Sequence, residues 1–316
     1  MNSRLNFKIF FPLIASAIAI LISKFVPNKI QAYRTVYWIP FICTFAIIFL
    51  LLVLISLKNK KLLHNLKEKA PLITVAIFIL SLMEVLTAKT RILPLPYFPA
   101  PGQVVDAMIT DWKMLLTSAL YSLRMLFLGY FAGAALGLIT GTMIGWNKRL
   151  NYWLSPLQKV IGPIPATAWI PIAMTVFPTS FTASIFILAL TVWFPVTVMT
   201  SSGIANVRKS YFEVAETLGA NKWYLIFKVA LPSALPNIFI GLFMGLGTSF
   251  VTLIVAEMLG VKAGLGWYIN WAQGWAEYKK VYASLVVMSL LFSTIITLLF
   301  KVRDRILIWQ RGLIKW

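Results

Sequence analysis

Apolar residues occur in eight long blocks that are separated by short polar and basic segments. A helix needs about 20 apolar residues to cross roughly 30 Å of hydrocarbon. The blocks lie at roughly 9–26, 36–57, 70–88, 117–145, 165–178, 181–203, 234–256 and 281–300. The fifth block is short and contains Pro171. The pattern predicts an all-α integral membrane protein with about eight transmembrane helices.

The composition supports this interpretation and excludes several others. Of the 316 residues, 60% are hydrophobic and 12% are charged, whereas a soluble domain is about half apolar and a quarter charged. One cysteine, Cys43, and one histidine, His64, exclude a disulfide framework and a Cys/His metal cluster. The sequence shows neither an Asp-rich metal motif nor a nucleophile–base pair, so we expect no catalytic residues and no metal site.

The basic residues indicate the orientation of the chain more than a ligand. The 29 Lys and Arg residues outnumber the 9 Asp and Glu residues, which gives a net charge of +20. Most of them lie in alternate segments between the apolar blocks, beginning with the first segment. Cytoplasmic loops are enriched in Lys and Arg. We therefore predict a multi-pass protein of the plasma or inner membrane, with both termini in the cytoplasm and no nucleic-acid partner.

The chain divides into an N-terminal hairpin and a larger core. Residues 1–66 hold two apolar blocks and a basic linker, with no polar cluster and no recognisable chemistry. Over 67–305, Pro, Gly, Trp and polar residues interrupt the apolar blocks, as in helices that border a water-filled cavity. A polar loop at 204–233 lies within this core, and 306–316 form a basic tail that we expect in the cytoplasm.

The fourth apolar block carries a helix-packing pattern. Glycines recur in it at a spacing of four: Gly129, Gly133, Gly137, Gly141 and Gly145. Residues four apart share one face of a helix, and such a bare face lets two membrane helices approach closely. The pattern predicts tight packing within one subunit or, alternatively, a lining for a moving partner helix or a translocation path.

The polar loop has its own helical pattern. Residues 210–218 form a short amphipathic segment that Gly219 is expected to end. Asn221 follows as a candidate cap for a second helix, which Pro232 is expected to stop. A helix–turn–helix tied at both ends to membrane helices is suited to transmit motion from a soluble partner. The alternative is an interfacial loop without a partner.

This loop resembles the EAA loop of ATP-binding-cassette (ABC) importer permeases. The family pattern is E-A-A, three residues, G, nine residues, I, any residue, L-P. The matching residues here are Glu213-Val214-Ala215, Gly219, Val229 and Leu231-Pro232, with Val214 and Val229 as conservative departures. The resemblance implies contact with an ATPase by the loop residues Glu213, Ala215, Glu216, Gly219, Ala220, Lys222, Leu231 and Pro232.

The resemblance extends over about 70–305. Residues 94–105, 164–173 and 256–259, with Gly264-Leu265-Gly266, are similar to further segments of the nitrate/sulfonate/taurine/bicarbonate branch of type I importer permeases. It implies a type I permease core preceded by an extra hairpin, since the hairpin at 1–66 departs from the family pattern.

The resemblance also implies a subunit that is not itself an enzyme. No G-x-x-x-x-G-K-[ST] loop occurs in the chain, so no cofactor is expected on it, and ATP and Mg²⁺ would bind a cytoplasmic ABC ATPase. The other implied partners are an extracytoplasmic substrate-binding protein, a second permease subunit forming a homodimer, and membrane lipid. The substrate would be a small organic or inorganic anion that crosses by alternating access. A secondary transporter of similar helix count, or an importer of a vitamin or vitamin precursor, are the alternatives.

Charged residues within the apolar blocks are further candidates. Glu84, Arg124 and Glu257 lie inside or at the ends of predicted helices, where a charge is costly and either pairs structurally or serves function. Arg124 would suit an anionic substrate. The candidate residues of the translocation path are Arg124, Trp169, Thr248, Thr252 and Glu257.

Overall fold

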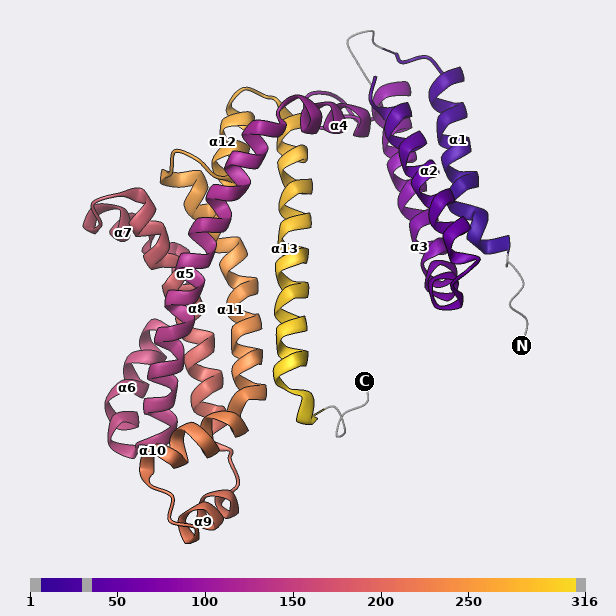
Figure 1. The fold of residues 1–316 in the computed structure, drawn as a ribbon. Coiled ribbons are helices and arrows are strands. Elements are labelled where there is room, and N and C mark those ends of the chain that lie inside the picture. The colour runs from indigo at the N-terminus through magenta and orange to yellow at the C-terminus, as the bar shows by residue number, and fades with distance from the viewer. Residues whose placement is uncertain (1–6, 30–35, 311–316) are drawn as a thin grey trace. The chain divides into compact units, whose positions relative to one another are not determined.

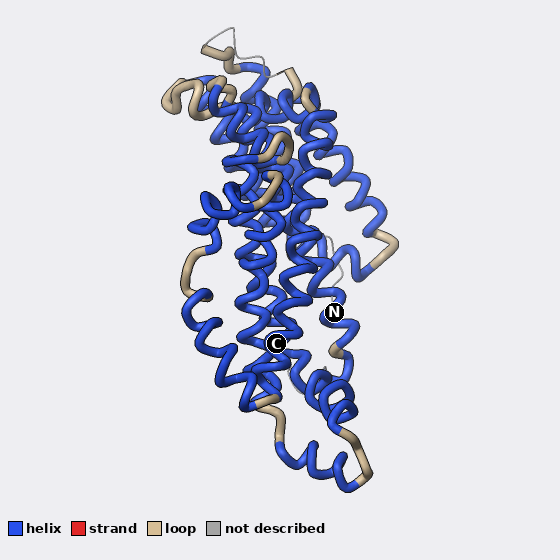
Figure 2. The backbone as a smooth tube through the Cα atoms, turned by 90° about the vertical axis from the view of Figure 1, so that its left-hand side faces the viewer, coloured by secondary structure: helices blue, strands red, loops and turns tan. Residues whose placement is uncertain are grey.

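The computed structural model describes residues 7–29 and 36–310, and within these ranges it contains helices and no strand (Figure 1). Figure 2 shows the same helices joined by short loops. The predicted all-α class is therefore confirmed. The predicted hairpin at 1–66 is described only from residue 7 and outside 30–35, and the predicted tail at 306–316 only up to residue 310. Contacts divide the chain into two units, Met1–Leu115 with Trp271–Val286, and Leu116–Asn270 with Val287–Trp316.

The first unit is built on three apolar helices. Its elements are η1 (Phe7–Phe10), α1 (Phe11–Phe25), α2 (Trp38–Ser56), α3 (Lys60–Glu84), the π-helical η2 (Val85–Lys89) and α4 (Pro101–Thr110). Asn59 begins α3 because its side-chain oxygen accepts hydrogen bonds from the backbone N–H groups of Lys61 and Leu62. The predicted domain boundary at 66/67 therefore falls inside α3, which packs against both α1 and α2.

The second unit contains the longer helices of the core. Its elements are α5 (Trp112–Trp146), α6 (Lys148–Ile161), η3 (Ala166–Trp169), α7 (Ile170–Val176), α8 (Ser180–Ala205), α9 (Lys209–Thr217), α10 (Lys222–Tyr224), the π-helical η4 (Leu225–Ala230), α11 (Leu231–Gly260), α12 (Leu265–Gly274), α13 (Tyr278–Ile306) and η5 (Ile308–Gln310). Helices α5, α12 and α13 begin or end in the first unit. Short α9 and α10 lie at one end of the unit, and α11 ends at the other (Figure 1).

Seven helices of the described chain are long and apolar enough to cross a membrane. They match all of the predicted blocks except 165–178. That block falls on η3 and α7, which form a bent pair with α6 at an angle of 86°. Pro163 and Pro165 explain the break, since proline cannot donate the backbone hydrogen bond that continues a helix, and Pro171 lies in the first turn of α7. Counting the bent pair as one span gives eight.

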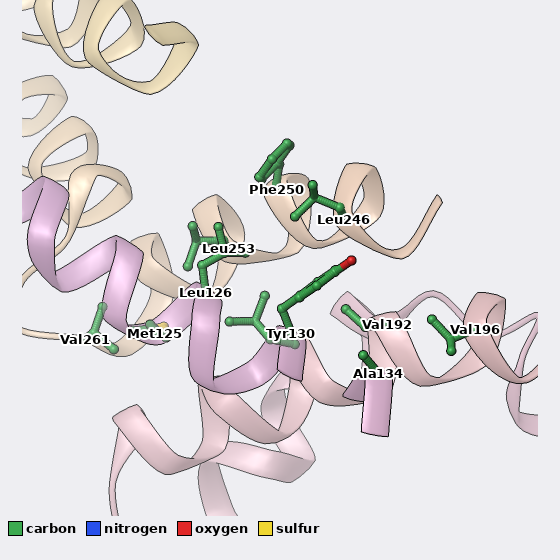
Figure 3. Close-up of a cluster of buried hydrophobic side chains, with 11 residues drawn as sticks. Met125, Leu126, Tyr130, Ala134, Val192, Val196, Leu246, Phe250, Leu253 and Val261 are labelled. Atoms are coloured by element: carbon green, nitrogen blue, oxygen red, sulfur yellow. The ribbon is translucent and has the colours of Figure 1, made fainter. Parts of the chain in front are cut away.

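The core of the second unit lies between α5, α8 and α11 (Figure 3). Its buried side chains include Leu126 and Tyr130 of α5, Val192 of α8 and Leu253 of α11. Tyr130 donates its hydroxyl proton to the backbone oxygen of Leu242 at 3.0 Å, which satisfies a polar group that apolar surroundings would otherwise leave costly. These three helices are thereby held together as one bundle.

The glycine face of α5 lies against α8 of the same chain. At Gly133, an added Cβ would come within 2.9 Å of the Cα atom of Ala189 and of the Cβ atom of Val192. At Gly141, it would lie 2.8 Å from the backbone oxygen of Thr197. Gly129, Gly137 and Gly145 meet α8 in the same way. The spacing of four therefore allows backbone-to-backbone packing within this chain.

Candidate functional site

Helix α9 ends in a glycine turn that its sequence specifies. The backbone N–H of Ala220 donates to the oxygen of Ala215 at 3.0 Å, and that of Gly219 donates to the oxygen of Glu216 at 2.9 Å. This pair of bonds is a Schellman motif, which places a residue of positive φ after the helix. Gly219 takes that position with φ +83°. The prediction that Gly219 ends the first helix of the loop is confirmed.

The second half of the loop starts at Asn221. Its side-chain oxygen accepts a hydrogen bond from the backbone N–H of Tyr224 at 2.8 Å and so caps α10. The chain then passes through η4 directly into α11, and 222–260 form one continuous helical stretch. The prediction that Pro232 stops this helix is wrong. Pro232 lies in the first turn of α11 after the wider π-helical segment, where its missing N–H is tolerated.

One aromatic side chain fixes the loop to the bundle. Phe212 of α9 packs against Trp146 at the end of α5, with ring centroids 5.7 Å apart. It also borders a buried cluster that contains Ile204 of α8 and Ala234 of α11. Leu231 packs on the same cluster. Phe212 therefore links α9 by direct contact to the ends of α5, α8 and α11.

The other face of the loop is open and chemically mixed. Its exposed apolar side chains are Tyr211, Val214, Leu218, Trp223, Tyr224 and Phe227. Glu213, Glu216 and Lys222 are exposed beside them, whereas Ala215 and Ala220 are half-buried. Leu218 is 83% exposed, which has no explanation in the packing of this chain. Several exposed large apolar side chains in one short loop are typical of a protein-binding surface.

Gly219 lies on this open face. No heavy atom lies within 4 Å of the position that a Cβ would take there. Steric packing within the chain therefore does not require glycine at this position; the positive φ does. The open space leaves room for another molecule to approach the backbone.

Two of the predicted path residues line a cavity in the second unit. Thr248 and Thr252 of α11 face a cavity of about 540 Å³ whose other walls are α8 and the break between α6 and η3. The hydroxyl groups of Thr252 and Thr191 lie 3.2 Å apart. The cavity lining is otherwise mostly apolar, and it includes Trp193 and Met244.

The remaining three path candidates do not line this cavity. The guanidinium carbon of exposed Arg124 lies 5.1 Å from the ring centroid of Phe181. Trp169 is half-buried, and its ring nitrogen is buried without a hydrogen-bond partner in the described part of the chain. Glu257 is fully buried.

Glu257 instead joins three helices at the end opposite to α9. One carboxylate oxygen accepts a hydrogen bond from the Ser122 hydroxyl of α5 at 2.6 Å, and the other accepts from the Gly266 N–H of α12 at 2.8 Å. The Ser122 oxygen in turn accepts from the Leu265 N–H at 2.9 Å. The carboxylate and the Ser122 hydroxyl thus accept hydrogen bonds from the first two N–H groups of α12, which have no partner within the helix itself. Ser122 is a partner that could not be predicted from the sequence, because it lies 135 residues away from Glu257 along the chain.

Glu84 has a similar position in the first unit. It is buried, and one carboxylate oxygen accepts a hydrogen bond from the Gly102 N–H at the start of α4, at 3.2 Å. Nearby, Lys89 donates to the backbone oxygens of Ser23 and Val26 at the end of α1. A carboxylate at the start of a helix and an ammonium group at the end of a helix both interact favourably with the helix dipole. These contacts give Glu84 and Lys89 structural roles.

A second cavity, which the sequence did not predict, lies at the end of the unit near α9. It has a volume of about 740 Å³ and is lined by the end of α5, by α6 and by the last turns of α8. Its polar lining residues are Lys148, Asn151, Ser155, Gln158, Lys159, Ser201 and Ser202. Two lysines and several uncharged donors give this cavity a basic, polar lining. No group of three or more His, Cys, Asp or Glu side chains that could hold a metal occurs among the described residues.

Solved structures of ABC transporters share this fold. A chain of the MetNI methionine ABC transporter, in an inward-facing conformation, is 20% identical and has a TM-score of 0.52 over 62% of this chain and 98% of that chain. A chain of an amino acid ABC transporter with histidines is 19% identical and has a TM-score of 0.51 over 66% of this chain and 97% of that chain. At this identity the likeness shows the fold alone.

Curated relatives are similar over shorter segments. The bicarbonate transport system permease protein CmpB of Synechococcus elongatus is 32% identical over 122 residues, 39% of this chain and 44% of that protein. The nitrate import permease protein NrtB of the same organism is 32% identical over 114 residues, 36% and 41% of the two chains. The formylaminopyrimidine transport permease protein ThiX of Halalkalibacterium halodurans is 28% identical over 159 residues, 50% and 64%. The chain thus aligns with less than two thirds of each of these relatives.

One family accounts for the core as a whole. Residues 133–307, more than half of the chain, match the family described as binding-protein-dependent transport system inner membrane component. The match covers the glycine face from Gly133 onward, both cavities, the loop with Gly219, and Glu257. It confirms the resemblance predicted from the polar loop. The chain is therefore a member of the family of binding-protein-dependent transport system inner membrane components.

Proposed function

We propose that this chain is the membrane-spanning permease subunit of an ATP-driven importer. In this proposal a separate cytoplasmic ATPase binds ATP with Mg²⁺ and contacts the loop around Gly219. The observation that carries it is the exposed helix–turn–helix of α9 and α10, which has the residue spacing of the EAA loop and an open apolar face. The end of the second unit that bears this loop would then face the cytoplasm, with both chain termini on that side of the cell membrane.

The loop is connected to the bundle so that a displacement of α9 and α10 would move the helices next to them. Only 206–208 separate α8 from α9, and α10 continues through η4 into α11. Phe212 adds the contact with α5. Closure of the ATPase around ATP would therefore displace α5, α8 and α11 together, and the two permease subunits of a homodimer would alternate between inward-open and outward-open states.

The proposed substrate is a small anion delivered by an external binding protein. CmpB is a bicarbonate permease and NrtB a nitrate permease, and both are relatives of this chain. The positive charges of Lys148 and Lys159 in the second cavity support an anionic substrate. ThiX supports a second candidate substrate, a small heterocycle, because that relative is a formylaminopyrimidine permease.

The experiment that tests this proposal is reconstitution with the energy source varied. The chain is purified with the ATPase subunit that accompanies it and inserted into vesicles, and bicarbonate and nitrate uptake are measured with the binding protein present. We expect uptake to require ATP and the ATPase. Uptake driven by a proton or sodium gradient, with the ATPase absent, would identify a secondary transporter instead.

A further inference from the structure

The two cavities of the second unit meet at two side chains of α8. Phe194 and Val198 line both the 540 Å³ cavity and the 740 Å³ cavity. They are four residues apart and therefore lie on one face of the helix. The facing wall is the break that follows α6, where Gly162 and Ile164 line the first cavity and Pro163 lines the second.

The two cavities differ in chemistry. The first has no charged residue in its lining, and its only hydroxyl groups are those of four threonines, among them Thr248 and Thr252. The second has Lys148 and Lys159 and a set of amide and hydroxyl groups. It borders Ala205, the last residue of α8 before the loop that contains α9. A chamber with a basic, polar lining and a mostly apolar chamber thus adjoin each other, with Phe194 and Val198 at their boundary.

The Phe194 ring rests directly on the backbone of Gly162. A Cβ added at Gly162 would overlap three carbon atoms of this ring, so the absence of a side chain there is what allows the ring its position. Gly162 follows the last residue of α6, at the break between the two helices of the bent pair. The Phe194 ring therefore packs on a helix break. A change in the angle between α6 and α7 would move Gly162 away from the ring.

We propose that Phe194, seated on Gly162, is the barrier that separates the two chambers. The inference rests on the proposed function, because it assigns Phe194 as the residue that closes the path of the imported anion. An apolar constriction excludes hydrated ions without binding them, and the lysines of the second chamber receive the anion after it passes. Val198 narrows the same boundary one turn further along α8.

The test measures access to the first chamber from the side that bears α9. Cys43 is the single cysteine of the chain, so Cys43→Ser provides a cysteine-free background. Thr248→Cys reports on the first chamber and Ser202→Cys on the second. The assembled transporter is placed in sealed vesicles, oriented so that Ser202→Cys reacts with the membrane-impermeant anionic reagent 2-sulfonatoethyl methanethiosulfonate, and the two labelling rates are compared.

With Phe194 present, Thr248→Cys should react roughly tenfold or more slowly than Ser202→Cys, and Phe194→Ala should remove about that factor. Phe194→Leu, which keeps a branched apolar side chain, should give an intermediate rate. Phe186→Ala is the matched control, because Phe186 is on the same helix but lines neither cavity. The Ser202→Cys rate, measured in each variant, verifies that the second chamber is intact.

Two results would overturn the barrier. In the first, Thr248→Cys reacts as fast as Ser202→Cys while Phe194 is present. In the second, neither Phe194→Ala nor Phe194→Leu changes the Thr248→Cys rate. Labelling requires neither ATP nor a transported substrate, so it stays informative if uptake proves independent of an ATPase. Failure of the barrier and failure of the proposed function are therefore seen in separate measurements.

Discussion

The two ends of the second unit use acidic residues in opposite ways. At one end, Glu257 is fully buried, and its carboxylate accepts hydrogen bonds from Ser122 and Gly266. At the other end, Glu213 and Glu216 are exposed and form no ion pair with any residue in the described ranges. At the first end the carboxylate finds its hydrogen-bond partners within the chain. At the second end, charged and apolar side chains are exposed on the surface.

We interpret this difference as two roles: residues at the Glu257 end stabilise the fold, and residues of the exposed loop serve transport. A buried carboxylate with several hydrogen bonds is costly to remove, because its partners then remain buried and unsatisfied. An exposed carboxylate contributes little to folding, and under the proposed function Glu213 and Glu216 would instead contact the ATPase. We therefore expect substitutions at the Glu257 end and along the helix interface to reduce folded protein. Substitutions on the exposed face of the loop should reduce transport alone.

The largest effect on stability is expected at the glycine face. Gly133→Leu would force side-chain atoms into the backbone of α8 at Ala189 and should cost about 3 kcal/mol. The measurement is the thermal midpoint and the yield of monodisperse protein in detergent. Gly247→Leu is the control, since no heavy atom lies within 4 Å of a Cβ at Gly247. Equal stability of the two variants would contradict the packing of α5 on α8.

Glu257→Ala should have the next largest effect. It leaves the Ser122 hydroxyl and the Gly266 N–H without their acceptor, at a cost of about 2 kcal/mol. Glu257→Gln keeps one acceptor oxygen and should lose less. Thermal unfolding of both variants in detergent distinguishes this role from a path-lining role, in which uptake would fall while the unfolding midpoint stayed unchanged.

Phe212→Ala tests the joint between the loop and the bundle. The ring contact with Trp146 should be worth about 1 kcal/mol, and its loss should also weaken transport because α9 is no longer fixed to α5. Tyr211→Ala is the matched variant, because the neighbouring Tyr211 is 51% exposed. The unfolding midpoint should fall in the first variant and stay constant in the second.

The smallest effect on stability is expected from the exposed carboxylates. Glu213→Gln and Glu216→Gln should change the free energy of unfolding by no more than about 0.5 kcal/mol, while ATP-dependent uptake falls. Unfolding curves and vesicle uptake are measured on the same preparations. A large loss of stability in either variant would mean that the loop face is buried by its own chain, and the contrast between the two ends would fail.

The sequence predicted the features that depend on nearby residues. Apolar length predicted the spanning helices, and the glycine spacing predicted a close helix contact, because both patterns repeat along one helix. Gly219 and Asn221 were predicted because helix ends follow local rules. The role of Pro232 was missed, since a π-helical segment before it was not visible in the pattern.

Features made by distant segments were not predicted. Ser122 and Glu257 meet only when α5 and α11 pack, so the sequence left the role of Glu257 open. The boundary between the cavities needs Phe194 from α8 and Gly162 from the end of α6, and neither residue has a local signal. The path candidates at Arg124 and Trp169 were chosen by residue type, and the cavity walls include neither.

Gly219→Asp in the complete transporter tests most directly whether the loop couples the bundle to an ATPase. Gly219 has a φ of +83°, a conformation that destabilises the folded state by about 1 kcal/mol for a residue with a side chain. The added carboxylate also occupies the open space where the ATPase would approach. We expect normal insertion into the membrane and an unchanged elution profile, with uptake and stimulated ATP hydrolysis reduced to background. Wild-type uptake together with wild-type stimulation of the ATPase would contradict this coupling.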